Sequence, residues 1–245
     1  MKKIKIINWN IGNPSIDRLR KQVEYLKKIN PDIMVLTESG NREKNEVLRS
    51  FFYDLNYNLF YNDNFIDKYS AVIVIRSNIN CKNLHFERID INSRITSIVL
   101  DIYDREVFLI GTYFPANNRK KIEKKKEHTK LLFDVLDNVN SNRVMLIGDF
   151  NSVKRVHIPK FSWFRKWEYE IFDKILSYRL IDVNDVFNYD KKLYSWYGNK
   201  NIGHLYDYTY MSKELLENVE SAYFDKNTIT QKLSDHACQI IEMRS

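Results

Sequence analysis

The chain has 245 residues, which corresponds to one large domain or two small ones at about 150 residues per domain. Only six residues are glycine and four are proline, while 44% are hydrophobic. This composition excludes collagen-like, linker-like and low-complexity classes and provides a sizeable core. Thirty-nine Lys and Arg against 32 Asp and Glu give a net charge of +7, which favours a polyanionic partner such as nucleic acid.

Neither a repeat nor a change of composition marks a domain boundary, so we expect a single domain over residues 1–245. No apolar run approaches the ~20 residues that span a bilayer, and Lys5, Asn8 and Asn10 interrupt any signal-peptide core. We therefore expect a cytoplasmic protein without a membrane partner. Cys81 and Cys238 are isolated and indicate neither a disulfide framework nor a metal-binding knuckle.

Four short runs rich in β-branched residues each lead into a polar residue. Residues 4–7 lead to Asn10, residues 33–37 to Glu38, residues 107–110 to Tyr113, and residues 144–147 to Asp149 and Asn151. Each run has the length and composition of a strand that is buried on both faces. Each strand would therefore deliver a polar side chain at its carboxyl end.

Helical patterns alternate with some of these strands. One helix is predicted between Ser15, as N-cap, and Pro31; a second over residues 131–136, after a lysine-rich stretch; and a third near residues 172–176. Residues 71–75 and 95–103 instead read as consecutive strands. This mixture favours an α/β protein with mixed sheets rather than fully parallel ones.

Two later motifs precede their strands. Asp207 comes just before residues 208–211, and Asp235 and His236 come just before residues 237–241. If these strands run antiparallel to the earlier ones, their beginnings meet the ends of the earlier strands. The sequence therefore predicts that all these polar side chains converge on one rim.

Carboxylates gathered in this way repel one another, by about 4 kcal/mol per close pair at an effective dielectric near 20, so a cation is needed among them. A set of oxygen ligands with a single His and no Cys suits Mg²⁺ or Mn²⁺ better than zinc. Mg²⁺ usually completes its shell with water and substrate phosphate, so the predicted chemistry is phosphodiester hydrolysis.

The motifs, taken together and in order, resemble the endonuclease/exonuclease/phosphatase superfamily. They are Asn8-Trp9-Asn10, Leu36-Thr37-Glu38, Tyr113-Phe114-Pro115, Gly148-Asp149-Phe150-Asn151, Tyr194-Ser195-Trp196, Asp207-Tyr208 and Ser234-Asp235-His236. The resemblance implies a deoxyribonuclease-I-like four-layer α/β sandwich, in which two mixed β-sheets pack face to face between helices. It also implies that Glu38 is the main metal ligand, with Asn10 and Asp235 completing or supporting the metal shell.

The same resemblance implies roles for five catalytic side chains. Asp149 would orient or deprotonate the attacking water, and Asn151 would hold that water or a phosphate oxygen. His236, oriented by Asp207, would donate a hydrogen bond to a non-bridging oxygen in the transition state. Tyr113 would contact the same phosphoryl group.

Within the superfamily, the Tyr113-Phe114-Pro115 motif is similar to that of the exonuclease III and abasic-site (AP) endonuclease branch. Trp196 would help to wall a pocket for a flipped-out abasic sugar. This implies a metal-dependent AP endonuclease or 3′-exonuclease that acts on DNA, expected to be duplex, leaves a 3′-hydroxyl and needs no obligate protein partner. Arg119 lies where related nucleases carry a DNA-contacting Arg.

One departure from that branch affects substrate choice. Leu205-Tyr206-Asp207 lacks the usual Arg, and Tyr206 makes the substrate pocket bulkier. The alternatives are a phosphodiesterase or phosphatase of RNA, nucleotides or phosphoinositides, a non-specific endonuclease, and a pseudo-nuclease that only binds nucleic acid.

Two further segments have more than one interpretation. Most lysines of residues 120–130 are expected on a solvated helix face. The aromatic residues of 161–172, with Phe164, Trp167, Ile171 and Ile175 at helical spacing, are expected in the core. Trp163, together with residues 157–160, could instead form a lid or a DNA-facing loop.

Overall fold

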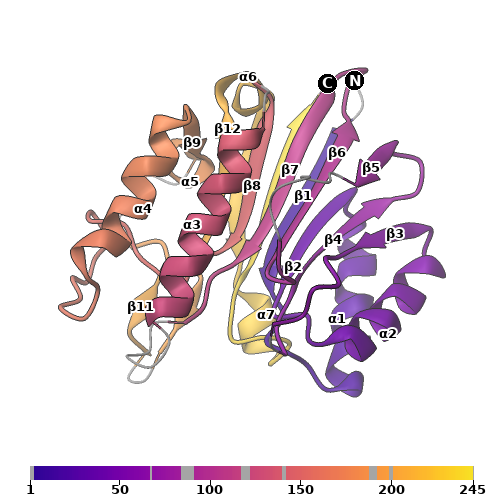
Figure 1. Ribbon diagram of the computed structural model, residues 1–245. Coiled ribbons are helices and arrows are strands. Elements are labelled where there is room, and N and C mark those ends of the chain that lie inside the picture. The colour runs from indigo at the N-terminus through magenta and orange to yellow at the C-terminus, as the bar shows by residue number, and fades with distance from the viewer. Residues whose placement is uncertain are drawn as a thin grey trace.

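The computed structural model describes residues 3–66, 68–83, 91–116, 122–139, 142–187, 192–198 and 201–244. Two mixed six-stranded sheets pack face to face, and helices cover the outer face of each sheet (Figure 1). This is the predicted four-layer α/β sandwich of the deoxyribonuclease-I-like type.

The first sheet has the order β13-β14-β1-β2-β4-β3. Its strands are β1 (Lys3–Asn10), β2 (Ile33–Thr37), β3 (Tyr57–Phe60), β4 (Ala71–Arg76), β13 (Val219–Asp225) and β14 (Cys238–Arg244). Only β1 and β2 are parallel neighbours; the other neighbouring pairs of this sheet are antiparallel.

The second sheet has the order β5-β6-β7-β8-β12-β9. Its strands are β5 (Cys81–Asn83), β6 (Ile95–Asp101), β7 (Glu106–Tyr113), β8 (Val144–Asp149), β9 (Leu180–Asp182) and β12 (Asp207–Ser212). Here β7 and β8 are parallel. A separate two-stranded ribbon joins β10 (Trp196–Tyr197) to β11 (Gly203–His204).

In the described ranges, four longer helices form the outer layers, and three short helices join strands. Helices α1 (Ile16–Ile29) and α2 (Arg42–Tyr53) cover the first sheet, and α3 (Ile122–Asn138) and α4 (Lys166–Ser177) cover the second (Figure 1). The short helices are α5 (Val183–Phe187), α6 (Lys213–Leu216) and α7 (Asn227–Thr230). None of the helices in these described ranges has the length and apolarity of a membrane span.

The central core lies between the two sheets. Ile6 and Val35 of the first sheet belong to the same buried cluster as Ile147 and Met211 of the second. The central strands β2, β4 and β8 are buried on both faces, which explains why their sequences are continuous apolar runs. Two rigid sheets therefore support the rim at which the polar residues are found.

Several predicted boundaries differ from the structure. The strand predicted to reach Tyr103 ends at Asp101, and Tyr103 lies in a turn with a φ of 57°. The helix predicted over residues 131–136 begins earlier, at Ile122, and so includes much of the lysine-rich stretch. Phe164 is buried but precedes α4, which begins after Arg165.

The predicted strand directions are confirmed and bring the motifs together. Strand β12 runs antiparallel to β8, so Asp207 pairs with Asp149. Strand β14 runs antiparallel to β1, which places His236, just before β14, beside the end of β1. Gly148 allows β7 and β8 to approach closely at the same rim, because a Cβ atom there would lie 1.8 Å from the Thr112 carbonyl oxygen of β7.

Candidate active site

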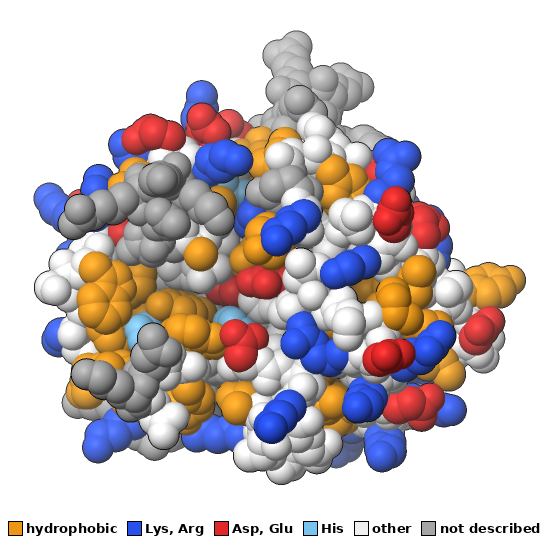
Figure 2. Space-filling model, turned by 90° about the horizontal axis from the view of Figure 1, so that it is seen from below, with side chains coloured by type: hydrophobic (Ala, Val, Ile, Leu, Met, Phe, Trp, Pro, Cys, Tyr) orange, Lys and Arg blue, Asp and Glu red, His pale blue; other side chains and the backbone are white. Residues whose placement is uncertain are grey.

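Two carboxylates and an imidazole form a compact buried group on the rim. One side-chain ligand atom from each of Asp149, Asp207 and His236 lies within 4.8 Å of the others, and all three residues are buried. Figure 2 views this face of the molecule and shows acidic side chains at the bottom of a central hollow. The strand ends thus deliver titratable groups to a depression that substrate can enter.

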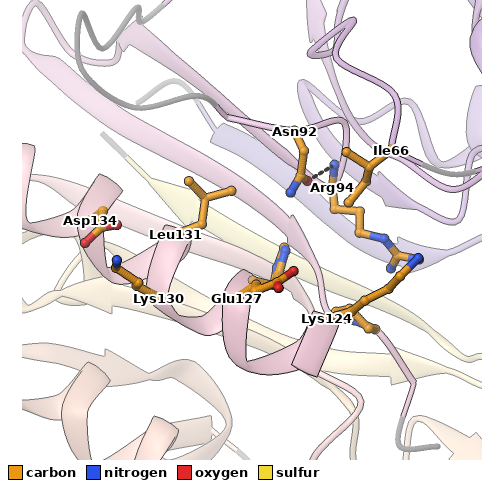
Figure 3. A pocket seen from close by; sticks show the side chains of 10 residues that line it. Ile66, Asn92, Arg94, Lys124, Glu127, Lys130, Leu131 and Asp134 are labelled. Carbon is orange, nitrogen blue, oxygen red and sulfur yellow. Dashed lines mark hydrogen bonds between the residues drawn. The ribbon is translucent and has the colours of Figure 1, made fainter. Parts of the chain in front are cut away.

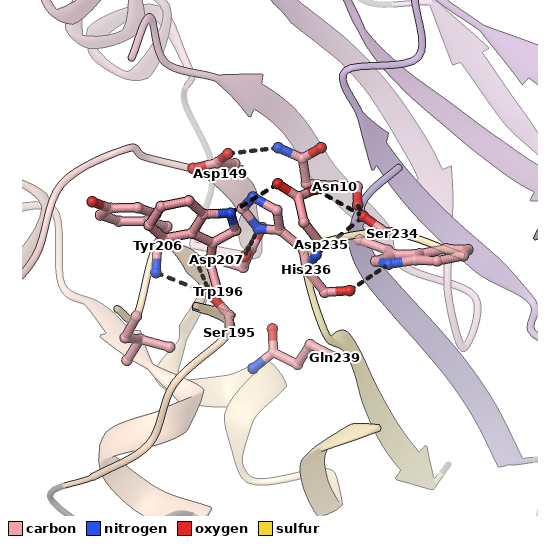
Figure 4. Close-up of polar contacts among 12 residues, drawn as sticks. Asn10, Asp149, Ser195, Trp196, Tyr206, Asp207, Ser234, Asp235, His236 and Gln239 are labelled. Carbon is pink, nitrogen blue, oxygen red and sulfur yellow. Dashed lines mark hydrogen bonds and ion pairs between the residues drawn. The ribbon is translucent and has the colours of Figure 1, made fainter. Parts of the chain in front are cut away.

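His236 and Asp207 form a hydrogen-bonded ion pair. His236 Nδ1 lies 2.7 Å from Asp207 Oδ2 (Figure 4). Burial lowers the pKa of His236, but the charge of Asp207 and its hydrogen bond outweigh burial and raise this pKa to about 10. The imidazole is therefore protonated at neutral pH, and its Nε2 atom can donate a hydrogen bond to an anionic substrate.

Asp149 accepts hydrogen bonds on both carboxylate oxygens. Asn10 Nδ2 donates to Oδ2 at 2.8 Å, and the backbone N–H of Asn151 donates to Oδ1 at 2.7 Å. Burial, followed by the negative charge of Asp207, raises the pKa of Asp149 to about 8. A carboxylate with a raised pKa is a stronger base than an ordinary aspartate, and it can accept a proton from water once it is ionised.

Two residues of the site adopt a backbone conformation that is rare outside glycine. The φ of Glu38 is 53° and that of Asn151 is 46°. Such left-handed conformations cost free energy and persist where the surroundings hold them, and they are frequent at functional sites. The Asn151 side chain is fixed by donating to the Phe114 carbonyl at 3.0 Å.

Glu38 is linked to the same network from the other sheet. Its Oε1 atom accepts hydrogen bonds from Tyr113 Oη at 2.6 Å and from Asn10 Nδ2 at 3.3 Å. Burial and then the charge of Glu38 raise the pKa of Tyr113, so its hydroxyl stays protonated and acts as a donor. The Arg94 guanidinium lies over the Tyr113 ring, 4.5 Å from its centroid.

The acidic group suits a divalent cation. Among the described residues, no hydrogen-bond donor reaches Asp207 Oδ1, although this atom is buried. Buried acceptors normally have a partner, and a site with carboxylate oxygens fits Mg²⁺ or Mn²⁺. Asp149 and Asp207, with Glu38 nearby, are the residues that could hold such an ion.

Only two of the three metal ligands predicted from the sequence lie in the hydrogen-bond network of Asp149. Asn10 and Glu38 lie in the hydrogen-bond network of Asp149, whereas Asp235 is exposed, and its Oδ2 accepts a hydrogen bond from Trp196 Nε1 at 2.9 Å. The role of these three residues as ligands therefore stays a prediction.

Metal affinity should depend on pH through Asp149. Below its raised pKa this carboxyl group holds a proton that a nearby cation must displace, so affinity should rise as the pH increases from 6 to 8 and level off above that range. Isothermal titration calorimetry with Mg²⁺ or Mn²⁺ in buffers of different ionisation enthalpy would measure the released proton. An Asp149→Asn variant should release correspondingly fewer protons, and an unchanged release would contradict this assignment.

Two of the three residues predicted to bind substrate, Trp196 and Tyr206, lie beside His236. The rings of Trp196 and Tyr206 stack with centroids 5.6 Å apart, and the ring of Trp196 lies 6.4 Å from that of His236 (Figure 4). Arg119 lies outside the described residues.

Two serines support the site, and their roles were not predicted from the sequence. Ser195 Oγ accepts hydrogen bonds from the backbone N–H groups of Tyr206 and Asp207, at 3.0 and 3.2 Å. Ser234 Oγ donates to the Asn10 carbonyl at 2.6 Å and accepts from the His236 N–H at 3.1 Å. Both serines belong to the motifs quoted above, and this was the signal in the sequence that could have identified their roles.

The position of Lys125 differs most from the prediction. This residue was expected on a solvated helix face with the other lysines, but it is only 1% exposed. Its Nζ atom donates to Glu168 Oε1 at 2.7 Å, to the Asn151 carbonyl at 2.8 Å and to Ser152 Oγ at 2.8 Å. The negative charge of Glu168 offsets the cost of burying this lysine, and the lysine ties the Asn151 loop to α3 and α4.

A separate cavity of about 400 Å³ lies along α3 (Figure 3). Its lining residues are Ile66, Asn92, Arg94, Pro115, Lys124, Glu127, His128, Lys130, Leu131 and Asp134. The cavity contains none of Asp149, Asp207 and His236. Its link to the site is Arg94, which donates to the Tyr113 carbonyl at 3.3 Å.

Comparison with solved structures identifies proteins of the same fold. The 3′ phosphatase NExo from Neisseria, solved with a product DNA hairpin, is 19% identical, with a TM-score of 0.78 over 99% of this chain and 100% of that one. An AP endonuclease from Archaeoglobus fulgidus has the same identity, TM-score and coverage. The AP endonuclease LMAP from Leishmania major is 15% identical, with a TM-score of 0.81 over 100% of this chain and 88% of that one.

The sequence comparisons point to the family rather than to an individual relative. A comparison with curated proteins found no match. The model of the Endonuclease/Exonuclease/phosphatase family matches residues 7–236, a range that contains every residue of the site described above. The chain therefore belongs to the endonuclease/exonuclease/phosphatase family.

Proposed function

We propose that the protein is a Mg²⁺- or Mn²⁺-dependent nuclease that hydrolyses phosphodiester bonds of DNA and leaves a 3′-hydroxyl, in the manner of AP endonucleases and 3′-exonucleases. The observation that carries the proposal is the buried arrangement of Asp149 beside the His236–Asp207 ion pair. It places a carboxylate that can act as a base next to a charged hydrogen-bond donor, the two groups that in-line attack of water on a phosphodiester needs.

In the proposed reaction, Asp149 in its ionised form accepts a proton from water. The water oxygen forms a bond to phosphorus, the bond from phosphorus to the 3′ oxygen breaks, and that oxygen takes up a proton to become the 3′-hydroxyl. Protonated His236 donates a hydrogen bond to a phosphoryl oxygen, on which negative charge accumulates. The Tyr113 hydroxyl, which donates to Glu38 in the absence of substrate, would contact the same phosphoryl group after exchanging that acceptor. The carboxylates of the site, Asp207 among them, would hold a divalent cation, which would supply Lewis-acid stabilisation of that charge.

Cations on the opposite side of the hollow favour a polyanionic substrate. Figure 2 shows Lys and Arg side chains gathered on the side of α1 and α2. Burial, followed by the charges of Arg18 and Lys68, lowers the pKa of Lys44. A phosphate backbone would relieve their mutual repulsion.

A panel of substrates tests the proposal. Equal concentrations of undamaged duplex DNA, duplex DNA with a tetrahydrofuran abasic site, the corresponding RNA, a mononucleotide and a phosphoinositide would be incubated with Mg²⁺. We expect the highest kcat/KM on one of the two DNA substrates. Higher kcat/KM on RNA, the mononucleotide or the phosphoinositide would reject DNA as the substrate class.

A further inference from the structure

A continuous row of aromatic rings leads away from His236 along the rim. We call it the aromatic wall, and it consists of Trp196, Tyr206, His204, Phe161 and Trp163. The ring of His204 lies 5.2 Å from Trp196 and stacks on Phe161 with a centroid distance of 4.2 Å and an interplanar angle of 1°. Phe161 in turn lies 4.4 Å from Trp163. The wall therefore joins the catalytic group to the exposed loop that carries Trp163.

The inner end of the wall is closed to a sugar. Trp196 and Tyr206 stack at 5.6 Å, whereas two rings that enclose a sugar must lie about 7–8 Å apart, because each carbon contact takes 3.5–4.0 Å. The indole N–H of Trp196 is also held by Asp235. A flipped-out abasic sugar therefore has no space between these two rings.

The outer end of the wall is open and apolar. Trp163 is 54% exposed, and Val156, Ile158 and Ile202 are also exposed hydrophobic residues from neighbouring loops. Figure 2 shows hydrophobic side chains gathered on this side of the acidic hollow. Burial lowers the pKa of His204, so the wall is uncharged at neutral pH and offers flat ring faces.

Cations flank this apolar surface in the sequence. Residues 154–166, which carry Phe161 and Trp163, include five Lys or Arg residues and no Asp or Glu. Lys154, Arg155 and Lys166 pair with acidic residues outside this segment, and Lys160 and Arg165 form no ion pair within the described part of the chain. Aromatic rings beside a cationic path are the combination by which proteins bind unpaired nucleic acid strands, since bases stack on the rings while phosphates meet the cations.

On these grounds we propose that the aromatic wall binds unpaired, base-bearing nucleotides at the 3′ end of a DNA substrate, so that the protein trims 3′ ends with intact bases in preference to incising abasic sites. This inference rests on the proposed function, because it takes the scissile phosphate to lie beside His236.

Binding to two matched overhangs tests the wall separately from catalysis. The Asp149→Asn protein would be titrated by fluorescence anisotropy against a labelled duplex with three unpaired 3′ nucleotides, and against the same duplex with three tetrahydrofuran residues in their place. We expect about tenfold tighter binding of the base-bearing overhang. Trp163→Ala in this background should remove most of that preference, and Trp163→Phe should keep most of it.

Tyr53→Ala provides the control, because Tyr53 is a 75% exposed aromatic residue on α2, away from the wall; it should leave the preference unchanged. Equal binding of the two overhangs, tighter binding of the tetrahydrofuran overhang, or a preference that survives Trp163→Ala would overturn the inference. If the base preference is found but the unmutated protein hydrolyses no DNA, the wall is supported and the proposed nuclease function is rejected.

Discussion

Asp149→Asn should lower kcat on DNA by about 10²- to 10⁴-fold, the usual contribution of a general base. The substitution keeps the shape of the side chain but removes the proton acceptor to which Asn10 and Asn151 donate. Single-turnover hydrolysis with saturating enzyme would measure the chemical step. Asp17→Asn is the matched control, since Asp17 is an exposed acid on α1 whose loss should leave kcat unchanged.

The same substitution should make the metal-free protein more stable at alkaline pH. Burial raises the pKa of Asp149 in the folded state to about 8, so the folded state binds more protons than the unfolded state between about pH 4 and pH 8. The stability of the unmutated protein should therefore fall as the pH rises through this window, and Asn at position 149 should remove that loss. Lower stability of the variant than of the unmutated protein at pH 9 would contradict the electrostatic account.

Lys125→Met should lower the free energy of unfolding by about 3–5 kcal/mol, the typical cost of breaking a buried ion pair. It leaves Glu168, which is 1% exposed, without the ammonium group that it faces at 2.7 Å. Because Lys125 also holds the Asn151 carbonyl, kcat should fall as well. Urea unfolding, with the midpoint and the slope analysed separately, would measure the stability change.

Two further variants distinguish the effect of breaking the Lys125–Glu168 ion pair from the effect of losing any lysine of α3. Lys126→Met removes the charge of the next residue of α3. The Lys126 side chain is 48% exposed and faces an exposed Glu123, so this substitution should change the free energy of unfolding by less than about 0.5 kcal/mol. Adding Glu168→Gln to Lys125→Met should recover part of the lost stability, because the remaining side chain is then uncharged. If the loss in free energy of unfolding of the double variant equals the sum of the losses of the two single variants, the two groups do not interact.

The central strands and their motifs could be predicted because local sequence determines them. Apolar runs buried on both faces identify β1, β2, β7 and β8, and the polar residue at the end of each run follows directly. The antiparallel direction of β12 and β14 was an assumption, which the pairings of Asp207 with Asp149 and of Asn8 with Gln239 confirm. The convergence of the site therefore followed from strand direction and the order of motifs.

Other features depend on contacts that the sequence does not display. Lys125 looks like its neighbouring lysines, and only Glu168, 43 residues later, distinguishes it. Helix α2 was not predicted, although Leu48 and Phe52 on its buried face have the i, i+4 spacing of an amphipathic helix. The stack of Trp196 on Tyr206 needs the β10–β11 ribbon, whose two-residue strands are too short to predict from their composition.

The most direct test of the proposed activity is the chemistry of the DNA ends that the unmutated protein makes. A labelled duplex with an unpaired 3′ overhang would be incubated with Mg²⁺, with and without excess EDTA, and the products offered to a DNA polymerase, which extends only 3′-hydroxyl ends. The proposed mechanism predicts shortened, extendable strands with Mg²⁺ and none with EDTA. Intact DNA in both samples, cleavage that persists in EDTA, or products that cannot be extended would contradict it.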